Sequence, residues 1–400
     1  LELLDGYFSN HYEPELNPSL VAKAKALKSS YGGNLEYAAK VLSTAKRPFA
    51  LAGGGLLNSG AEAVKNLYEL SKKTRMAVGN TLMGFGTYPL EDEQFVGMVG
   101  MHGLYAATKT LYKADVVLAL ARLDDRVIGN VGEFRRNGKK VIQVDIDPEE
   151  LGRRMEVIPL MGDISEVLKY LIDNVQPKGN YEQWWSQINK WKNEDPVSYD
   201  KGRKDVILPQ YLIEEVMRII PPDSIISTGV GASQMWAAQK AKHVSLNGWL
   251  SSGGYGTMGH GLPALIGAWF AHPEKQFWDI DGDGSFEMTM QALGMVNHYN
   301  IPAKIVIPID GYRIVRQWQT KMYGGRTNGS EQRSPDFAKI AEAYGIEGIN
   351  VTRRDNVIRT LEYMCDKKGP VLGAFDVDRN EKVLPWILAG RGFYTGIIVK

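Results

Sequence analysis

Short apolar runs that end in glycine or aspartate recur along this chain, and they constrain its fold more than any other feature. Apolar residues at helical spacing lie between them, as in AEAVKNLYELSKKT (61–74). Strands that alternate with helices predict an α/β fold with parallel sheets covered by helices on both faces. The expected strands are PFALAGGG (48–55), ADVVLALA (114–121), KKVIQVDIDP (139–148), DSIISTGVG (223–231), QFWDIDGDGSF (276–286), AKIVIPIDGY (303–312) and GPVLGAFDVD (369–378).

Residues 176–206 interrupt this rhythm with a polar, charged and aromatic stretch that contains Pro177 and Pro196. We interpret it as a connection that carries a helix, because 400 residues are long enough for two or three domains. The sequence therefore predicts two doubly wound parallel-sheet domains joined by a linker. The expected divisions are 1–45, with helices around Leu20–Leu27 and Leu35–Ala45, then a first domain at 46–178, a linker at 179–206 and a second domain at 207–400.

Charge and cysteine content exclude several classes of protein. Lys and Arg number 47 against 46 Asp and Glu, so there is no basic excess for binding nucleic acid. The single cysteine, Cys365, excludes internal disulfides and cysteine-rich zinc modules. The uncharged run 244–273 holds seven glycines and Pro263, which favours a buried Gly-rich turn and a core helix over a membrane span. The first residues lack the pattern of a signal peptide, so we expect a cytoplasmic protein.

Two aspartates at strand ends suggest a cation site. Asp283 lies in DGDGSF, and Asp310 follows the next strand. The carboxyl ends of parallel strands meet along one edge, where carboxylates suit a hard cation such as Mg²⁺. Gly284 and Ser285 are expected to open a helix from Met288, whose N-terminus can accept a phosphate. Taken alone, a D-G-D-G pattern is more often a pair of turn caps, so both interpretations remain open here.

The longer segment is more specific. GDGSFEMTMQALGMVNHYNIPAKIVI (282–307) and VRQWQTKMYGGR (315–326) closely resemble the thiamin-diphosphate motif of acetohydroxyacid synthase (acetolactate synthase) catalytic subunits. The resemblance extends in the same order from about residue 47 to the C-terminus. Its other landmarks are MGFGTYP (83–89), GMVGMHGLYAATK (97–109), ARLDDRVIGN (121–130), VDIDP (144–148), QMWAAQ (234–239), SSGGYGTMGHGLPALIGA (251–268) and KVLPWILAG (382–390).

The resemblance implies that the second domain binds thiamin diphosphate and Mg²⁺. Asp283 and Asp310 occupy the positions of two metal ligands, and the backbone carbonyl of Tyr312 would be the third. The residues expected at the reactive carbon, the cofactor's bend and the acceptor pocket are Met258, Met288, Val315 and Trp318. The other expected cofactor contacts are Val230, Gly231, Gln234, Met235, Gly256, Gly284 and Ser285.

For the first domain, the resemblance implies an FAD site in which the flavin does no net redox work. A glycine run allows close approach of a nucleotide, arginines can bind a pyrophosphate, and carboxylates can accept from ribose hydroxyls. Standing alone, such a charged cluster is more typical of a solvated ion-pair face. The expected residues are Gly53, Gly54, Gly55, Thr81, Leu82, Met101, His102, Arg122, Asp124, Arg126, Asp145, Ile146 and Asp163.

The implied activity is decarboxylation of pyruvate and condensation of the two-carbon unit with pyruvate or 2-ketobutyrate, in branched-chain amino-acid biosynthesis. Expected partners are 2-ketoacid substrates, further copies of the chain in a homo-oligomer, a regulatory small subunit, and a source of the family's pyrimidine-binding domain. That domain carries the activating glutamate and precedes the matched region. Nucleic acid and membrane are not expected as partners.

The chain departs from the family at several positions. Ile309 and Asp310 replace tandem asparagines, and the loop after them is one residue shorter. Ala232 and Ser233 replace a Gln and a His that cradle the diphosphate, and Leu120 replaces a glycine. These changes leave open an alternative, a catalytically inactive FAD- or nucleotide-binding scaffold or regulatory homologue. Another thiamin-dependent decarboxylase or carboligase is a weaker alternative.

Overall fold

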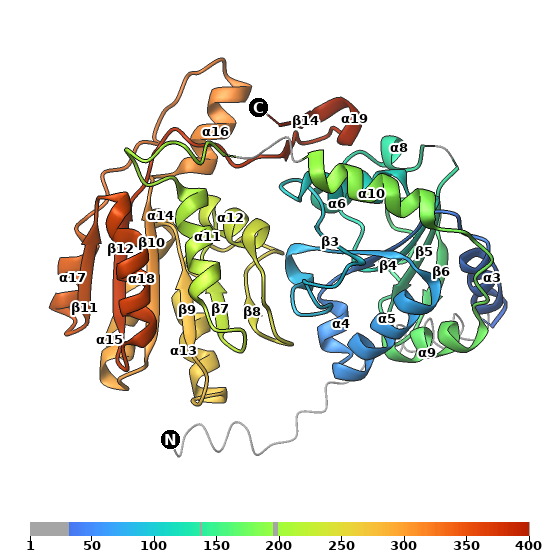
Figure 1. Ribbon diagram of the computed structural model, residues 1–400, viewed down its shortest axis with the longest axis horizontal. Helices are drawn as coiled ribbons and strands as arrows, with labels where there is room; N and C mark the ends of the chain where they lie inside the picture. Colours follow the sequence, from blue (N-terminus) through green and yellow to red (C-terminus); the bar gives the residue numbers. More distant parts are fainter. Residues whose placement is uncertain (1–31, 137, 195–198, 400) are drawn as a thin grey trace.

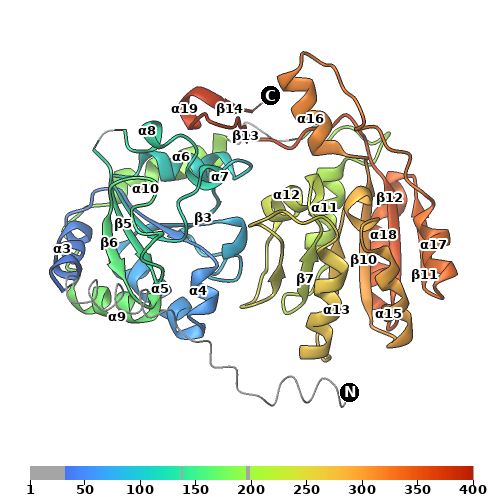
Figure 2. The same ribbon diagram turned by 180° about the vertical axis from the view of Figure 1, so that it is seen from behind.

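Two α/β units make up the chain in the computed structural model, which describes residues 32–136, 138–194 and 199–399. Each unit is built on a six-stranded parallel sheet with helices on both faces (Figures 1 and 2). The α/β prediction with two doubly wound parallel sheets is therefore confirmed. The expected helix at Leu20–Leu27 lies outside the described residues.

The first sheet has the strand order β3-β2-β1-β4-β5-β6. Its strands are β1 (Pro48–Ala52), β2 (Ala77–Asn80), β3 (Phe95–Met98), β4 (Val116–Leu120), β5 (Lys140–Asp145) and β6 (Ile158–Met161). The helices of this unit are α3 (Gly32–Ser43), α4 (Gly55–Asn58), α5 (Ala61–Thr74), η1 (Leu82–Gly84), α6 (Tyr105–Lys113), α7 (Asp125–Ile128), α8 (Val131–Phe134), α9 (Ile164–Asn174) and α10 (Glu182–Glu194).

Side-chain alternation along β1 explains why helices cover both faces of the first sheet. Phe49 and Leu51 point into one core, shared with α6 and α10. Ala50 and Ala52 point into the other core, shared with α3, α5 and α9. Successive side chains of a strand face opposite sides, so a strand that is apolar at every position needs cover on both.

The second sheet has the strand order β11-β12-β10-β9-β7-β8. Its strands are β7 (Ile225–Thr228), β8 (Trp249–Leu250), β9 (Phe277–Ile280), β10 (Ala303–Ile309), β11 (Glu347–Val351) and β12 (Val371–Asp376). Its helices are α11 (Pro209–Ile219), α12 (Ala232–Lys240), α13 (Gly261–Ala271), α14 (Asp283–Phe286), η2 (Met290–Ala292), α15 (Leu293–His298), α16 (Arg313–Met322), α17 (Phe337–Ala343), η3 (Arg354–Asn356) and α18 (Val357–Asp366).

The strand orders predict where ligands would bind. In open α/β sheets a ligand site forms where neighbouring strands connect in opposite directions, outside their carboxyl ends. In the first sheet this switch point lies between β1 and β4, and in the second between β7 and β9. The loops that follow these four strands are therefore the first places to look for function.

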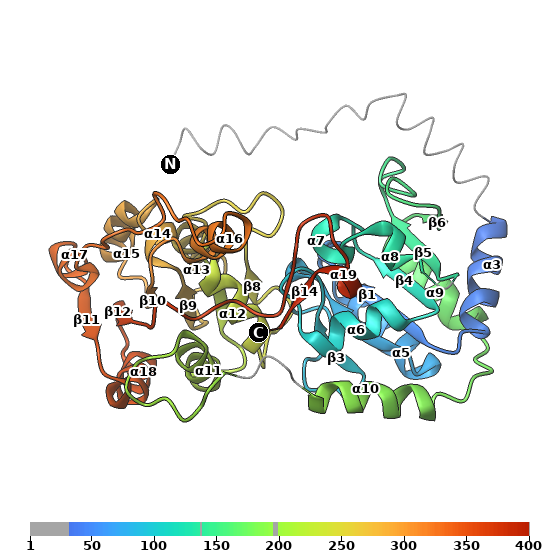
Figure 3. The same cartoon turned by 90° about the horizontal axis from the view of Figure 1, so that it is seen from above.

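The C-terminal segment joins the two units. After β12 the chain runs back to the first unit and forms β13 (Trp386–Ile387), α19 (Phe393–Gly396) and β14 (Ile397–Ile398) there (Figure 3). The amide of Ile387 donates to the carbonyl of Met101, 2.9 Å away. Buried Glu133 accepts from the amides of Gly392 and Tyr394, at 3.2 and 2.9 Å. This segment therefore fastens the second unit to the first.

Two local expectations were wrong. The helix expected from Met288 begins earlier, at Asp283, and is broken into α14, η2 and α15, so Met288 lies in a turn between the first two pieces. The Gly-rich turn before α13 is not buried, since Tyr255 is 98% exposed. The connection between the units does carry a helix, α10, whose tryptophans pack into the core of the first unit.

Candidate functional site

The loops after β7 and β9 meet closely at the switch point of the second sheet. Asp281, the first residue after β9, is fully buried. A side chain on Gly229, in the loop after β7, would bring its Cβ within 1.4 Å of Asp281 Oδ1. Burial and the neighbouring Asp279 raise the pKa of Asp281 well above its ordinary value, and burial raises the pKa of Asp279 to about 7. Asp279 and Asp281 thus form a buried pair of acidic side chains, shielded from water, at this edge of the sheet.

Ser285 holds three loops of this edge together. Its hydroxyl oxygen accepts from the amides of Val230 and Gly259, at 3.1 and 3.0 Å. It therefore connects the loop after β7, the Gly-rich loop before α13 and the first turn of α14. Ser285 was expected to contact a cofactor, and in the structure its oxygen organises the backbone around the edge.

Asp283 is buried and faces the loop after β10. Its Oδ2 accepts from the amide of Gly311, 2.9 Å away, and from the hydroxyl of Ser334. Its Oδ1 accepts from the amide of Gly284 at 2.9 Å. Backbone and hydroxyl donors thus hold the carboxylate in a fixed orientation at the ends of β9 and β10.

Asp310 lies at the end of β10 and is paired with a buried arginine. Its Oδ2 is 3.1 Å from Nε of Arg313, and the side chains are 6% and 3% exposed. Burial raises the pKa of Asp310 to about 7, with a further increase from Asp283 and an opposing decrease from Arg313. Gly311, the residue after Asp310, donates its amide to Asp283 at 2.9 Å, so the two expected metal-binding residues lie close together.

The third expected ligand, the carbonyl of Tyr312, caps α16. It accepts from the amide of Arg316 at 3.0 Å. The ring of Tyr312 covers Gly284, where an added Cβ would lie 2.5 Å from Cε1 of the tyrosine. A carbonyl oxygen has a second lone pair, so this hydrogen bond leaves one position for a cation.

The N-terminus of α12 lies beside Gly282, the residue before Asp283, and carries an unpartnered hydroxyl. Ser233 is 3% exposed, and its Oγ has no hydrogen-bond partner among the described residues. That oxygen is 3.4 Å from the position of a Cβ on Gly282, the residue before Asp283. A nine-residue helix offers amide donors and a positive dipole end here, which suit a phosphate. Buried Gln234 instead donates to Ser251 at 2.8 Å.

The residues expected around the reactive carbon occupy two regions of this edge. Met288 is 49% exposed, and its Cβ lies 2.9 Å from the position of a Cβ on Gly259, next to Met258. Val315, on α16, is 48% exposed. Trp318, on the same helix, packs edge-to-face on Trp386 at 4.9 Å between ring centroids.

The other expected cofactor contacts of the second unit lie in its loops and at the start of α12. Gly256 has a φ of +70°, a backbone conformation that suits glycine. Val230, Gly231 and Met235 are partly buried.

The donor set fits a hard divalent cation in its chemistry. Carboxylate and carbonyl oxygens are the ligands that Mg²⁺ takes in proteins, usually with water and phosphate oxygens. Within residues 32–136, 138–194 and 199–399, no three His, Cys, Asp or Glu side chains gather as a metal-binding group. The expected set has only two such side chains, so the remaining ligands would have to come from the backbone, water and the diphosphate.

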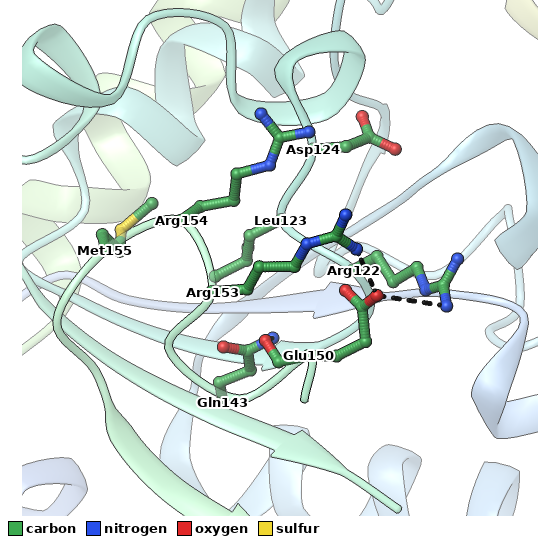
Figure 4. A pocket seen from close by; sticks show the side chains of 8 residues that line it. All are labelled: Arg122, Leu123, Asp124, Gln143, Glu150, Arg153, Arg154 and Met155. Atoms are coloured by element: carbon green, nitrogen blue, oxygen red, sulfur yellow. Dashed lines mark hydrogen bonds and ion pairs between the residues drawn. The ribbon is translucent and has the colours of Figure 1, made fainter. Parts of the chain in front are cut away.

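In the first sheet a more open, charged site lies one strand away from the switch point, between β4 and β5. A cavity of about 150 Å³ lies beyond the ends of β4 and β5 (Figure 4). Glu150 lies between Arg122 and Arg153, at 3.3 and 2.7 Å from their nearest nitrogens. The cavity is smaller than a typical nucleotide pocket, so it fits one part of such a ligand. Its lining residues are Arg122, Leu123, Asp124, Gln143, Glu150, Arg153, Arg154 and Met155.

Several residues expected to bind FAD have local structural partners. Asp124 caps α7 and Asp163 caps α9 through backbone amides. Arg126 donates to the carbonyl of Gly254 at 3.0 Å, across to the second unit. Nδ1 of His102, which is 5% exposed, donates to the carbonyl of Pro385 at 3.2 Å. The carboxylate of Asp145 accepts from the amide of Asp147 at 3.0 Å.

The remaining expected residues vary in exposure. A Cβ on Gly53 would lie 2.5 Å from Cβ of Ala121, and one on Gly54 would lie 3.3 Å from the carbonyl of Met83, so both glycines permit close packing. Ile146 is 72% exposed, and Leu120 is a core residue of β4. Gly55 is exposed, Thr81 is buried, and Leu82 and Met101 are partly buried.

Sequence reasoning missed four residues at these two edges. Arg313 and Ser334 bind the carboxylates of Asp310 and Asp283, and Glu150 and Arg153 line the cavity. The spacing of Asp310 and Arg313, three positions apart at a helix start, was a usable signal. Ser334 carried none, because it reaches Asp283 from 51 positions away.

Comparison with known protein families agrees with this geometry. Residues 229–373 match "Thiamine pyrophosphate enzyme, C-terminal TPP binding domain", and residues 35–171 match "Thiamine pyrophosphate enzyme, central domain". Thiamine pyrophosphate is another name for thiamin diphosphate. The chain therefore belongs to the thiamine pyrophosphate enzyme family and carries its central and C-terminal domains.

Within that family, curated relatives of the chain include acetolactate synthase subunits. The chain is 35% identical to the mitochondrial acetolactate synthase catalytic subunit of Saccharomyces cerevisiae, over 90% of this chain and 54% of the relative. It is also 35% identical to the acetolactate synthase large subunits of Corynebacterium glutamicum and Haemophilus influenzae, over 92% and 93% of this chain and 60% and 66% of theirs. The chain thus spans between 54% and 66% of the length of these relatives. No described helix is long and apolar enough to cross a membrane.

Proposed function

We propose that this chain forms the metal- and diphosphate-binding part of an acetohydroxyacid (acetolactate) synthase. The reaction would decarboxylate pyruvate and condense the two-carbon unit with pyruvate or 2-ketobutyrate, in branched-chain amino-acid biosynthesis. The observation that carries this proposal is the buried, unpartnered Ser233 hydroxyl at the start of α12, which lies beside Gly282, the residue before the buried Asp283. The similarity to acetolactate synthase subunits supports it.

The residues of the second unit would divide the work as follows. Thiamin diphosphate, when bound, supplies an electron sink for decarboxylation of a 2-ketoacid. The carboxylates of Asp283 and Asp310 and the carbonyl of Tyr312 would hold Mg²⁺, while Ser233 and the amides of α12 would donate to the diphosphate. Met258 would support the bend of the cofactor. The residues that would line the acceptor pocket are Met288, Val315 and Trp318. Further cofactor contacts would come from Val230, Gly231, Gln234, Met235, Gly256, Gly284 and Ser285.

We also propose that the first unit binds FAD near the cavity beside β4 and β5. Arg122 would bind the pyrophosphate, because a guanidinium matches phosphate oxygens in a bidentate geometry. Arg153 and Arg154 line the same cavity and would add positive charge. The other proposed contacts are Gly53, Gly54, Gly55, Thr81, Leu82, Met101, His102, Asp124, Arg126, Asp145, Ile146 and Asp163.

The proposed partners follow from the same assignment. They are 2-ketoacid substrates, further copies of the chain in a homo-oligomer, a regulatory small subunit and a pyrimidine-binding domain that supplies the activating glutamate. The domain divisions at 45, 178 and 206 and a cytoplasmic location also stay predictions.

Acetolactate formation tests this proposal. Pyruvate, thiamin diphosphate, Mg²⁺ and FAD are supplied to this chain, first alone and then with a pyrimidine-binding domain from a relative. Activity in either setting, lost in Asp283→Ala, would support the synthase. Tight binding of thiamin diphosphate without CO₂ release in both settings would favour a nucleotide-binding scaffold. The pairing of Asp310 with Arg313 is the observation that keeps this second candidate open, since Arg313 occupies one carboxylate oxygen.

A further inference from the structure

Arg313 is a buried guanidinium whose three nitrogens all have partners. Nε donates to Oδ2 of Asp310 at 3.1 Å. Nη1 and Nη2 donate to the carbonyls of Glu381 and Asp378, at 2.8 and 2.7 Å. The Asp378 carboxylate itself pairs with Arg203, at 2.7 Å. Asp310 is therefore the carboxylate that compensates the charge of Arg313.

The same pairing determines which carboxylate oxygen of Asp310 is available to a ligand. Arg313 engages Oδ2, so Oδ1 is the oxygen of Asp310 that this pairing leaves for another ligand. The amide of Gly311, the residue after Asp310, donates to Asp283 at 2.9 Å, which keeps the two strand ends in register. Asp283 and Asp310 carry a formal charge of −2, and Arg313 brings the sum of these three side chains to −1. Arg316 lies further out, where its Nη2 donates to the carbonyl of Asp310 at 3.3 Å.

We propose that Arg313 is a positioning residue that converts Asp310 into a neutral, one-oxygen ligand of the divalent cation. The Asp310–Arg313 pair then has the charge and donor count of the asparagine that the family pattern has at this position. A pair without net charge offers a divalent cation one oxygen ligand and adds no repulsion toward a diphosphate. The inference rests on the proposed function and adds to it a residue that sets the charge of the cation site.

A double-mutant cycle on cation binding tests this without turnover. Mn²⁺ binding to the full chain is measured by electron paramagnetic resonance, with and without thiamin diphosphate, for wild type, Asp310→Asn, Arg313→Gln and the double variant. In Asp310→Asn the guanidinium is uncompensated, so Mn²⁺ affinity should fall by about tenfold or more. In Arg313→Gln free Mn²⁺ should bind several-fold tighter, whereas thiamin diphosphate should bind several-fold weaker. The double variant should return to within about threefold of wild type.

Two controls separate charge from folding. Arg313→Lys keeps the charge and should keep Mn²⁺ affinity within about fivefold, even if the contacts to the two carbonyls are weakened. Arg203→Gln loosens the same segment through Asp378 without touching Asp310, and it should leave Mn²⁺ affinity unchanged. Circular dichroism establishes that each variant is folded.

The outcomes distinguish this inference from the proposed function. If Arg313→Gln leaves the affinities for Mn²⁺ and thiamin diphosphate unchanged, if the double variant binds Mn²⁺ as weakly as Asp310→Asn, or if Arg203→Gln matches Arg313→Gln, Arg313 has only a structural role and the inference is overturned. Tighter Mn²⁺ binding in both Arg313→Gln and the double variant would mean that Arg313 merely competes with the cation. If wild type fails to bind Mn²⁺ even with thiamin diphosphate, both the inference and the proposed metal site are overturned.

Discussion

Both sheets carry their candidate sites at the carboxyl ends of their strands, but the two sites have opposite chemistry. At the edge of the first sheet, the side chains of Arg122 and Arg153 are 67% and 60% exposed and share Glu150. At the edge of the second sheet, four aspartates are between 0 and 4% exposed. They are Asp279, Asp281, Asp283 and Asp310.

The difference shows that the carboxyl ends of the strands give the general location of a site, whereas the packing of loops sets its electrostatics. In the second unit, Gly229 lets one loop approach another so closely that water is excluded from Asp281. In the first unit, the loops after β4 and β5 are not closely packed, and a cavity remains between them. Dehydration is what shifts a carboxyl pKa, so only the second edge carries groups whose pKa is raised to about 7.

The largest effect should come from adding a side chain at Gly229, where two loops of the second edge meet. In Gly229→Ala the new Cβ would overlap Asp281 Oδ1, at 1.4 Å, and crowd Ser285 Oγ, at 2.6 Å. We expect a loss of at least about 3 kcal/mol in the unfolding free energy of the second unit, measured by urea titration. Gly267→Ala, in open space on α13, should change it by less than about 1 kcal/mol. A Gly229→Ala protein as stable as this control would refute the close-packed edge.

The next effect concerns pH and Asp279. Burial raises its pKa from 3.8 to about 7, with Ser227 opposing. The folded state holds this proton more tightly than the unfolded chain, so the stabilisation is complete below about pH 4 and is lost as pH rises through 7. In Asp279→Asn the unfolding free energy should depend less on pH. At pH 8 it should exceed the wild-type value by about 2 kcal/mol, measured by urea unfolding from pH 5 to 8. If the unfolding free energies of the two proteins have the same dependence on pH, Asp279 does not cause the decline and the prediction is wrong.

The sheets themselves were predictable because most of their strands are short, mainly apolar runs that end in glycine or aspartate. The seven runs from 48–55 to 369–378 all contain an observed strand, and helix α5 has the predicted limits. The strands that sequence reasoning left out are short or interrupted by glycine. They are β2, β3, β6, β8 and β11.

The candidate site was predictable only where the signal is local. The pattern DGDGSF and a second aspartate after the next strand indicated two carboxylates, and both are buried at the same edge. The helix expected at Met288 failed because Gly259 packs against Met288 and Thr289, and Thr289 donates to the Gly259 carbonyl, which favours a turn. The partners of Arg313 were hidden because its carbonyl acceptors lie 65 and 68 positions away.

A smaller effect is expected at the seam between the two units, the contact of His102 with Pro385 and of Met101 with Ile387. Burial lowers the pKa of His102 from 6.5 to about 4. The folded state resists this protonation, so the contribution of His102 is present above pH 6.5 and is lost as pH falls toward 4. Between pH 6.5 and 5 the seam should weaken by about 1–2 kcal/mol, seen as faster hydrogen exchange at the Ile387 amide, which donates to Met101. His102→Gln should lose this pH dependence, and the exposed His272→Gln should keep it.

The smallest stability effect is expected at the first edge, where it separates a binding role from a structural one. Glu150 pairs with two mostly exposed arginines, and such ion pairs contribute little to folding. Glu150→Gln should therefore change the unfolding free energy by less than about 0.5 kcal/mol. It removes the carboxylate that competes for Arg122 and Arg153, so FAD or ADP should bind several-fold tighter in low salt, with the gain shrinking as salt rises.

Arg153→Gln is the matched variant, because it deletes a cation from the same cavity and should weaken nucleotide binding in the same titration. Equal nucleotide affinity in wild type, Glu150→Gln and Arg153→Gln would show that this cavity plays no part in binding. The two edges would then differ in kind, because the first would be a solvated ion-pair face and only the second a ligand site.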